Sequence, residues 1–340
     1  MNKKTILVAA AIFAIGAATA KEPFWLGGDI SGTTANEARG HFTRSVNGET
    51  RETTRLMKDY GMNATRLRVW VNPKDGFSSP ADVLKMAQRS QELGMPLMID
   101  FHYSDWWADP GKQYPPKAWE GLSLEQTADS LAAHTRNTLQ LLKDNGIDVK
   151  WVQVGNETTN GFLWPMAKIP DNYDNYAYLT KAGCKAVKEV YPEAKTIIHL
   201  DNGFDQNLYD RVFDNLKSRG VEWDIIGMSV YPYWAMEGKR EESEIMTLVD
   251  AIANINHLKD KYGSEIMIVE TGVDAREPEK GKQFIDALIK ASKKLTGGAC
   301  TGVFYWAPEI DADAAYHLGA FSEGKPTVIM DAFKNAAKSE

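Results

Sequence analysis

Cysteine is scarce in this chain of 340 residues, since only Cys184 and Cys300 occur. Cys184 lies in a helical stretch and Cys300 just before an expected strand, so this spacing favours two free thiols over a disulfide and makes no metal site. Histidine offers no metal site either. His102 and His199 belong to no His-x-x-x-His or glutamate-flanked spacing, and no third histidine follows closely. The sequence therefore argues against transition-metal chemistry.

Basic blocks and long apolar runs are also missing. The formal net charge is −7, and lysine and arginine are spread along the chain, which makes nucleic acid and anionic membranes poor partner candidates. The apolar run of residues 6–15 is too short to span a bilayer as a helix. Because Lys3 and Lys4 precede it and Ala18-Thr19-Ala20 follows, residues 1–20 read as a signal peptide; an amino-terminal helix packed on the domain is the alternative. We expect an exported protein, periplasmic or extracellular.

No Pro/Ser-rich linker, low-complexity tract or nucleotide-binding fingerprint interrupts residues 21–340. Strand-like runs alternate with helical patterns eight times, which predicts an α/β fold with a single (β/α)8 TIM barrel. An open doubly wound sheet is the alternative, but it usually carries a glycine-rich phosphate turn after its first strand, and here Gly27 and Gly28 lie within that strand. The expected strands are 24–29, 64–69, 96–101, 149–155, 195–200, 224–230, 265–270 and 302–306, and the expected helices are 50–60, 80–93, 123–145, 172–191, 206–219, 241–262, 278–295 and about 325–337.

Polar or aromatic residues follow nearly every expected strand. In a barrel, the carboxyl ends of the strands meet at one mouth, where such enzymes place their chemistry. One polar residue at a strand end ordinarily serves only to cap the strand through hydrogen bonds. Capping is a poor explanation when eight strands end in this way. The candidate binding residues at this mouth are Asp29, Arg68, Asp100, His102, Asn156, His199, Asp201, Tyr231 and Trp306.

Two glutamates stand out among these strand ends. The strings "WVQVGNETTNGFLWP" and "IMIVETG" are apolar runs that stop at Glu157 and Glu270, on the fourth and seventh strands. A pair of carboxyls suits glycoside hydrolysis, with retention at a separation of about 5–5.5 Å and inversion at about 6.5–9.5 Å. We expect Glu157 to stay protonated and Glu270 to stay ionised, with Arg68 as the cation that lowers its pKa and Tyr231 as a hydrogen-bond donor.

Aromatic residues accompany the polar ones. The segment 102–119, "HYSDWWADPGKQYPPKAW", is a long loop without periodicity, which is typical of a functional loop. Trp119 and Trp151 are expected to serve packing. Candidate faces for a sugar ring are Trp106, Trp107, Trp164, Trp234 and Trp306.

The mature chain resembles the family 53 glycoside hydrolases, the arabinogalactan endo-β-1,4-galactanases. The resemblance lies in "GGDIS" (27–31), "TRLRVWVNP" (65–73), "DFHYSDWWADPGKQ" (100–113), "GNETTNGFLWP" (155–165), "IIHLD" (197–201), "GMSVYPYW" (227–234), "IVETG" (268–272) and "YW" (305–306). It implies a retaining barrel with Glu157 as acid/base and Glu270 as nucleophile. It also implies binding-site roles for Arg68, His102, Asp105, Trp107, Asn156, His199, Tyr231 and Trp306.

The segment after Glu270, "TGVDAREPEKGK", is short where many bacterial relatives are expected to carry a longer calcium-holding loop. We therefore expect no cofactor, with bound calcium as the alternative. The sequence predicts an exported, monomeric, retaining endo-galactanase that acts on β-1,4-galactan or type I arabinogalactan. The alternatives are a retaining barrel acting on another β-1,4-glycan (mannan, xylan or glucan) and a non-catalytic sugar-binding barrel. Both glutamates together with Arg68 and Tyr231 argue against the last, since binding alone needs no poised charged pair.

Overall fold

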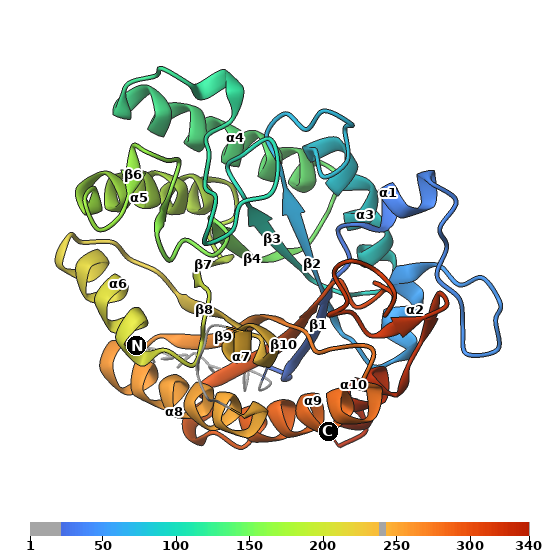
Figure 1. Cartoon of the computed structure of the whole chain (residues 1–340). Coiled ribbons are helices and arrows are strands. Elements are labelled where there is room, and N and C mark those ends of the chain that lie inside the picture. Colours follow the sequence, from blue (N-terminus) through green and yellow to red (C-terminus); the bar gives the residue numbers. More distant parts are fainter. Residues whose placement is uncertain (1–21, 238–242, 340) are drawn as a thin grey trace, which may run out of the picture.

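The structure is a computed structural model that describes residues 22–237 and 243–339. Eight parallel strands form a closed barrel, because the last strand pairs with the first, and helices surround it (Figure 1). This confirms the predicted (β/α)8 barrel. In barrel order the strands are β1 (Trp25–Asp29), β2 (Ala64–Val69), β3 (Leu97–Phe101), β4 (Val149–Val154), β7 (Lys195–Leu200), β8 (Ile225–Val230), β9 (Glu265–Thr271) and β10 (Cys300–Trp306).

The outer helices begin and end with local signals that the sequence contains. Ser123 and Gln126 form a reciprocal capping box at one helix start, and the Ser79 side chain caps another, which satisfies backbone N–H groups that have no intrahelical partner. The outer helices are α2 (Thr53–Asp59), α3 (Pro80–Glu92), α4 (Leu124–Asp144), α5 (Tyr173–Val190), α6 (Gln206–Ser218), α8 (Glu244–Tyr262), α9 (Pro278–Lys293) and α10 (Asp331–Ala337).

The last helix is the one that the sequence misplaced. It was expected from about residue 325, but α10 begins at Asp331. The preceding residues form the short strand β12 (Lys325–Pro326), which pairs with β11 (Phe321–Ser322), and then a 3₁₀ turn. The other short elements that the sequence did not predict are α1 (Thr33–Ala38), α7 (Pro232–Glu237) and the hairpin of β5 (Gly161–Phe162) and β6 (Ala167–Lys168).

Inside the barrel, apolar side chains fill the amino-terminal half and polar ones the carboxyl-terminal half. Trp151 and Phe304 are buried in the inner apolar cluster, so Trp151 serves packing, as expected. A Cβ on Gly27 would lie 2.1 Å from the Phe304 ring, which explains this glycine by close packing rather than by phosphate binding. On β2, Ala64 belongs to the same inner cluster, and alternation along the strand turns Arg66 and Arg68 inward above it.

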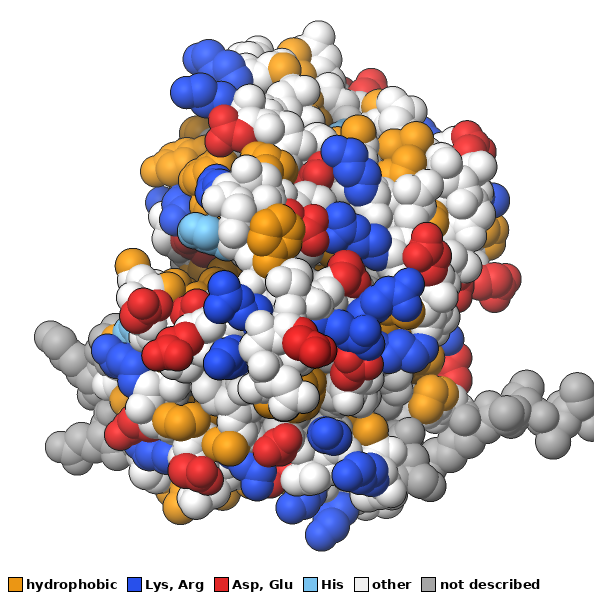
Figure 2. Space-filling model, turned by 90° about the vertical axis from the view of Figure 1, so that its right-hand side faces the viewer, with side chains coloured by type: hydrophobic (Ala, Val, Ile, Leu, Met, Phe, Trp, Pro, Cys, Tyr) orange, Lys and Arg blue, Asp and Glu red, His pale blue; other side chains and the backbone are white. Residues whose placement is uncertain are grey.

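On the face that Figure 2 shows, acidic and basic side chains are interspersed. Cys184 and Cys300 are both free, as expected. Within the described ranges, no helix is long and apolar enough to cross a bilayer, and no cluster of three or more His, Cys, Asp or Glu side chains is suited to a metal ion. The expected signal peptide lies outside the described residues.

Candidate active site

The main cleft lies over the carboxyl ends of the barrel strands and has a volume of about 680 Å³. It brings together residues from the carboxyl ends of β3, β4, β7, β8, β9 and β10 and from the loops that follow them. Nine of the residues that the sequence nominated line this cleft: His102, Trp107, Asn156, Glu157, Asp201, Tyr231, Trp234, Glu270 and Trp306.

Glu157 is held in an unusual backbone conformation just after β4. Its φ is +45°, and Gly155 two residues earlier has φ +92°. A non-glycine residue in the left-handed region costs about 1–3 kcal/mol and persists only where surrounding contacts enforce it. Here the Gln113 side chain donates to the backbone carbonyls of Asn156 (2.7 Å) and Glu157 (3.2 Å). The turn therefore fixes the direction in which the Glu157 side chain leaves the strand.

A chain of hydrogen bonds reaches the Glu157 carboxyl from below. Nδ1 of His199 lies 3.3 Å from the Glu157 backbone nitrogen and 3.2 Å from the Asn156 side-chain oxygen. Because the backbone N–H can only donate, we assign the ring proton to Nε2. Nε2 then donates to Ser229 Oγ at 2.8 Å, and Ser229 donates to Glu157 Oε1 at 2.6 Å. Burial holds the pKa of His199 well below its usual range, which keeps this ring neutral.

The Glu157 carboxyl keeps its proton readily. Burial raises its pKa well above the usual value, and the negative charges of Glu270 and Asp201 raise it further, against the hydrogen bond from Ser229. Burial also raises the pKa of Asp201 to about 6. A carboxyl whose pKa is raised holds its proton to higher pH and can donate it to a leaving group.

Glu270, near the end of β9, has donors on both oxygens. Arg66 Nη2 lies 2.8 Å from Oε1, and the Tyr231 hydroxyl donates to Oε2 at 3.0 Å, which confirms the expected Tyr231 contact. Burial raises the pKa of Glu270 to about 7, while Arg66 and Tyr231 act in the opposite direction. The expectation of a lowered pKa was wrong, because desolvation outweighs the cation. Glu270 is nevertheless the pair member with partners that stabilise its ionised form.

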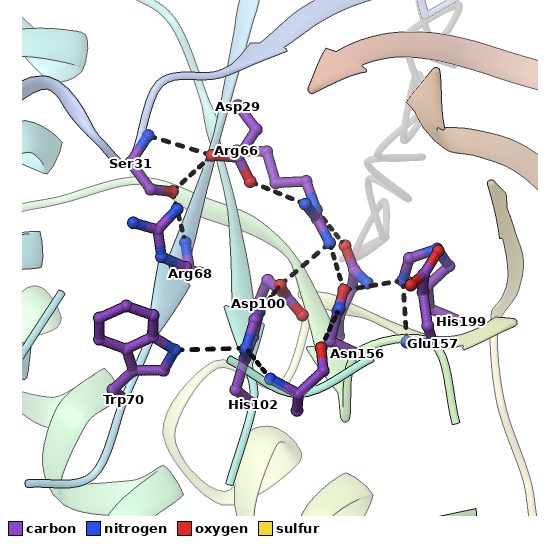
Figure 3. Close-up of polar contacts among 12 residues, drawn as sticks. Asp29, Ser31, Arg66, Arg68, Trp70, Asp100, His102, Asn156, Glu157 and His199 are labelled. Atoms are coloured by element: carbon purple, nitrogen blue, oxygen red, sulfur yellow. Dashed lines mark hydrogen bonds and ion pairs between the residues drawn. The ribbon is translucent and has the colours of Figure 1, made fainter. Parts of the chain in front are cut away.

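The cation beside Glu270 is Arg66, and the prediction of Arg68 was wrong. Arg66 donates to Asp29 (2.7 Å), Asp100 (2.9 Å) and the Asn156 side-chain oxygen (2.8 Å). Figure 3 shows its guanidinium among these groups, whereas that of Arg68 lies towards Ser31 and Trp70. Both arginines face inward from the same strand, and the deeper one reaches the floor of the cleft.

Three other nominated residues support the site without lining the cleft. Asp29 is 1 % exposed and accepts hydrogen bonds from Arg66 and Ser31, so it does not line the cleft. Asp105 accepts the backbone N–H groups of Asn72 and Lys117, both at 2.8 Å, and thereby ties two loops together. His199 is fully buried behind Glu157.

His102 faces the cleft and is fixed from behind. Its Nδ1 accepts hydrogen bonds from Trp70 Nε1 (3.3 Å) and the backbone of Ala108 (3.2 Å), so Nε2 carries the proton towards Asp100 at 3.0 Å. The ring is thereby held in one tautomer at the wall of the cleft.

Three of the five candidate tryptophans line the cleft: Trp107, Trp234 and Trp306. The Trp107 and Trp306 rings meet edge to face, with centroids 5.7 Å apart. Trp106 instead packs on Trp70, and Trp164 packs on Tyr114 outside this cleft.

Sequence reasoning missed Arg66 and Ser229. Both had a usable signal: Arg66 lies two residues before Arg68 on β2, and Ser229 on β8 lies two residues before Tyr231, which directly follows that strand, so each shares the face of a nominated residue. Ile310 and Tyr316, which also line the cleft, lie in a loop with no periodic pattern to indicate them.

A closed parallel barrel with two buried glutamates in contrasting environments at its mouth defines a barrel glycoside hydrolase. The sequence model "Glycosyl hydrolase family 53" matches residues 25–337, and the chain belongs to this family. It is 30 % identical over 305 residues to the arabinogalactan endo-β-1,4-galactanase A of Aspergillus niger, covering 83 % of this chain and 84 % of that protein.

Solved structures agree. A fungal β-1,4-galactanase superposes with a TM-score of 0.82 at 28 % identity, covering 92 % of this chain and 99 % of that one. The family 53 catalytic domain of Ignisphaera aggregans gives a TM-score of 0.81 at 29 % identity, covering 91 % of this chain and 95 % of that domain. An exo-β-1,4-mannosidase at 16 % identity, with a TM-score of 0.65, shares the fold alone.

Proposed function

We propose that this glycoside hydrolase is a retaining endo-β-1,4-galactanase that cuts internal linkages of β-1,4-galactan, such as type I arabinogalactan. Its similarity to arabinogalactan endo-β-1,4-galactanases supports the substrate. The cleft is open and aromatic-walled, as an enzyme that binds a chain in its middle requires. We further propose that the protein is exported after loss of residues 1–20 and acts as a monomer.

The reaction has two steps. In the first, a carboxylate oxygen of Glu270 attacks the anomeric carbon while Glu157 gives its proton to the departing glycosidic oxygen, which breaks that bond and leaves a glycosyl ester on Glu270. In the second, Glu157, now ionised, takes a proton from water, the hydroxide attacks the same carbon, and Glu270 departs as a carboxylate. Two inversions give net retention.

The observation that carries this proposal is the contrast between the two carboxyl groups. Glu270 has Arg66 on one oxygen and Tyr231 on the other, so its anion is stabilised where the nucleophile must be charged. Among the residues that the structure describes, the Glu157 carboxyl has one hydrogen-bond donor, the neutral Ser229 hydroxyl, and its pKa is raised by the negative charges of its neighbours. When the environments of two titratable groups push their pKa values apart, the acid and base roles can be assigned from that difference.

The test is a panel of soluble β-1,4-glycans (galactan, mannan, xylan and glucan) assayed for new reducing ends. Galactan should be cut with a rapid fall in viscosity, and Glu270→Ala should abolish the cutting while galacto-oligosaccharide binding remains. Glu120→Gln changes an exposed glutamate and serves as the matched control. If another glycan were cut faster than galactan, that glycan would be the substrate. Binding to galactan without cutting any glycan would instead support the sugar-binding alternative.

A further inference from the structure

A second cavity, of about 380 Å³, lies outside the catalytic cleft, among the segments that follow β3 and β4. Its walls come from the loop after β3, the first turn of α4 and residues 163–166, which join β5 to β6. Figure 1 shows α4 and β6 on the same side of the barrel. Among the residues that the structure describes, none lines both this cavity and the catalytic cleft.

Gln113 forms the partition between the two cavities. The chain passes from the wall of the cleft, at Lys112, to the wall of the second cavity, at Tyr114. The Gln113 carbonyl accepts the backbone N–H of Trp164 at 2.7 Å, and its side chain donates to the Asn156 carbonyl at 2.7 Å. Because the partition is fixed on both sides, a ligand in the second cavity does not have to displace one from the cleft.

Tyr114 and Trp164 give the second cavity two aromatic walls. Tyr114 is 62 % exposed, and the two rings meet edge to face with their centroids 6.2 Å apart. Trp164 Nε1 donates to the Asn160 carbonyl at 2.9 Å, and Lys168 Nζ lies 4.4 Å from the centre of the indole. The indole is thereby held in one orientation, so a ligand can pack on it at little cost in side-chain entropy.

Thr127 is the unexplained polar group of this cavity. It lines the cavity and is only 2 % exposed, and among the described residues its hydroxyl has no hydrogen-bond partner. Thr135 on the same helix donates to the carbonyl four residues earlier, at 2.8 Å. A buried hydroxyl that lacks such a bond is costly unless a ligand supplies a partner.

A neutral sugar ring fits these walls. The C–H face of a pyranose can pack on the Tyr114 and Trp164 rings, and a ring hydroxyl can donate to or accept from Thr127. An apolar side chain of a partner protein would leave the Thr127 hydroxyl without a partner. A polymer whose one segment lies in the cleft also brings its other sugars to this cavity at a high effective concentration.

Resting on the proposed galactanase function, we propose that the second cavity is a galactan-binding site separate from the catalytic cleft. Tyr114 and Trp164 pack against a galactosyl ring, and Thr127 forms a hydrogen bond with one of its hydroxyls. This site holds the polymer on the enzyme while the cleft cuts another segment. It therefore raises the apparent affinity for long chains and leaves unchanged the affinity for short ones that the cleft alone can hold.

The test combines binding with kinetics. Binding is measured as retardation in native gels that contain galactan, in a Glu270→Ala background that does not cut the polymer. Tyr114→Ala and Thr127→Val should each weaken this binding by about three- to tenfold, since each removes one contact with the sugar. In the active enzyme the same changes should lower kcat/KM for galactan and leave kcat/KM for galactotetraose unchanged.

Matched controls separate binding from folding. Thr138→Val removes another buried hydroxyl without a partner among the described residues, from the same helix but outside the cavity. Both threonine variants should keep or raise Tm, because each removes an unpaired buried hydroxyl, but Thr138→Val should leave galactan binding unchanged. Tyr178→Ala removes an exposed tyrosine of α5 and should also leave binding unchanged, whereas Tyr114→Trp keeps an aromatic ring and should retain most of it.

The outcomes distinguish this site from the proposed function. Galactan hydrolysis and retardation that neither Tyr114→Ala nor Thr127→Val changes would overturn the second site and leave the galactanase standing. Equal losses on galactotetraose and galactan would overturn its separation from the cleft. Absence of galactan hydrolysis by the unaltered enzyme would overturn the proposed function. In that case, retardation by galactan that Tyr114→Ala weakens would still support the site, and absence of retardation would overturn both.

Discussion

Removing the hydroxyl of Ser229 should move the basic limb of the pH profile without moving the acidic one. Ser229 donates to Glu157 Oε1 at 2.6 Å while it accepts from His199 at 2.8 Å. This donor stabilises the ionised form of Glu157 and so lowers its pKa. A hydrogen bond to a charged group contributes about 1.5–3 kcal/mol, and each pKa unit corresponds to about 1.36 kcal/mol. In Ser229→Ala, the pKa of Glu157 should therefore rise by roughly one to two units.

The assay is kcat/KM against pH on a soluble galacto-oligosaccharide. Because Glu157 must be protonated to act as the acid, a higher pKa keeps the enzyme active to higher pH, and the basic limb moves upward. The acidic limb should stay in place, since Glu270 is held by Arg66 and Tyr231. Ser229→Thr keeps a hydroxyl and should leave the basic limb where the unaltered enzyme has it. Ser218→Ala changes an exposed serine and serves as the control, in which neither limb should move. An unmoved basic limb with a lowered Tm would refute the reasoning and leave Ser229 with a packing role.

Three other changes test the remaining parts of the site. Arg66→Met should move the acidic limb to higher pH, because loss of the cation raises the pKa of Glu270. It should also lower the free energy of unfolding by about 3–5 kcal/mol, because buried carboxylates are left unpaired. An unchanged acidic limb would contradict this role of Arg66. Trp306→Ala should lower kcat/KM at least about tenfold through lost stacking on the attacked sugar with Tm within a few degrees, whereas a large loss of Tm with normal activity per folded molecule would indicate packing. Glu157→Gln should nearly abolish galactan cleavage yet spare much of the first step on an aryl glycoside with a good leaving group, because that step hardly needs protonation; equal losses would remove Glu157 from the acid role.

The barrel could be predicted from the sequence because each buried strand is a local apolar run. The runs expected at 64–69 and 195–200 coincide with β2 and β7, and the two glutamates end or follow such runs. The final helix was misplaced because Lys325 and Pro326 look compatible with a helix start, yet they pair with β11. That pairing depends on the tertiary path of the preceding loop, which no local pattern encodes.

The choice between Arg66 and Arg68 lay beyond the sequence for a different reason. Strand alternation places both on the inner face, and proximity to the strand end favoured Arg68. Which guanidinium reaches Glu270 depends on how deep in the barrel each arginine lies. Arg66 lies deeper, where it pairs with Asp29 and Asp100, and from there it reaches Glu270. Burial of Glu270 was equally hidden, so the sequence predicted a lowered pKa where desolvation raises it.

The most direct test of the central claim, that Glu270 is the nucleophile and Glu157 the acid/base of a retaining galactanase, is proton NMR of the anomeric signals during hydrolysis of a β-1,4-galacto-oligosaccharide. The account predicts that the β-anomer of the new reducing end appears first and that the α-anomer grows in only by mutarotation. First appearance of the α-anomer would show a single displacement by water and would contradict the covalent role of Glu270.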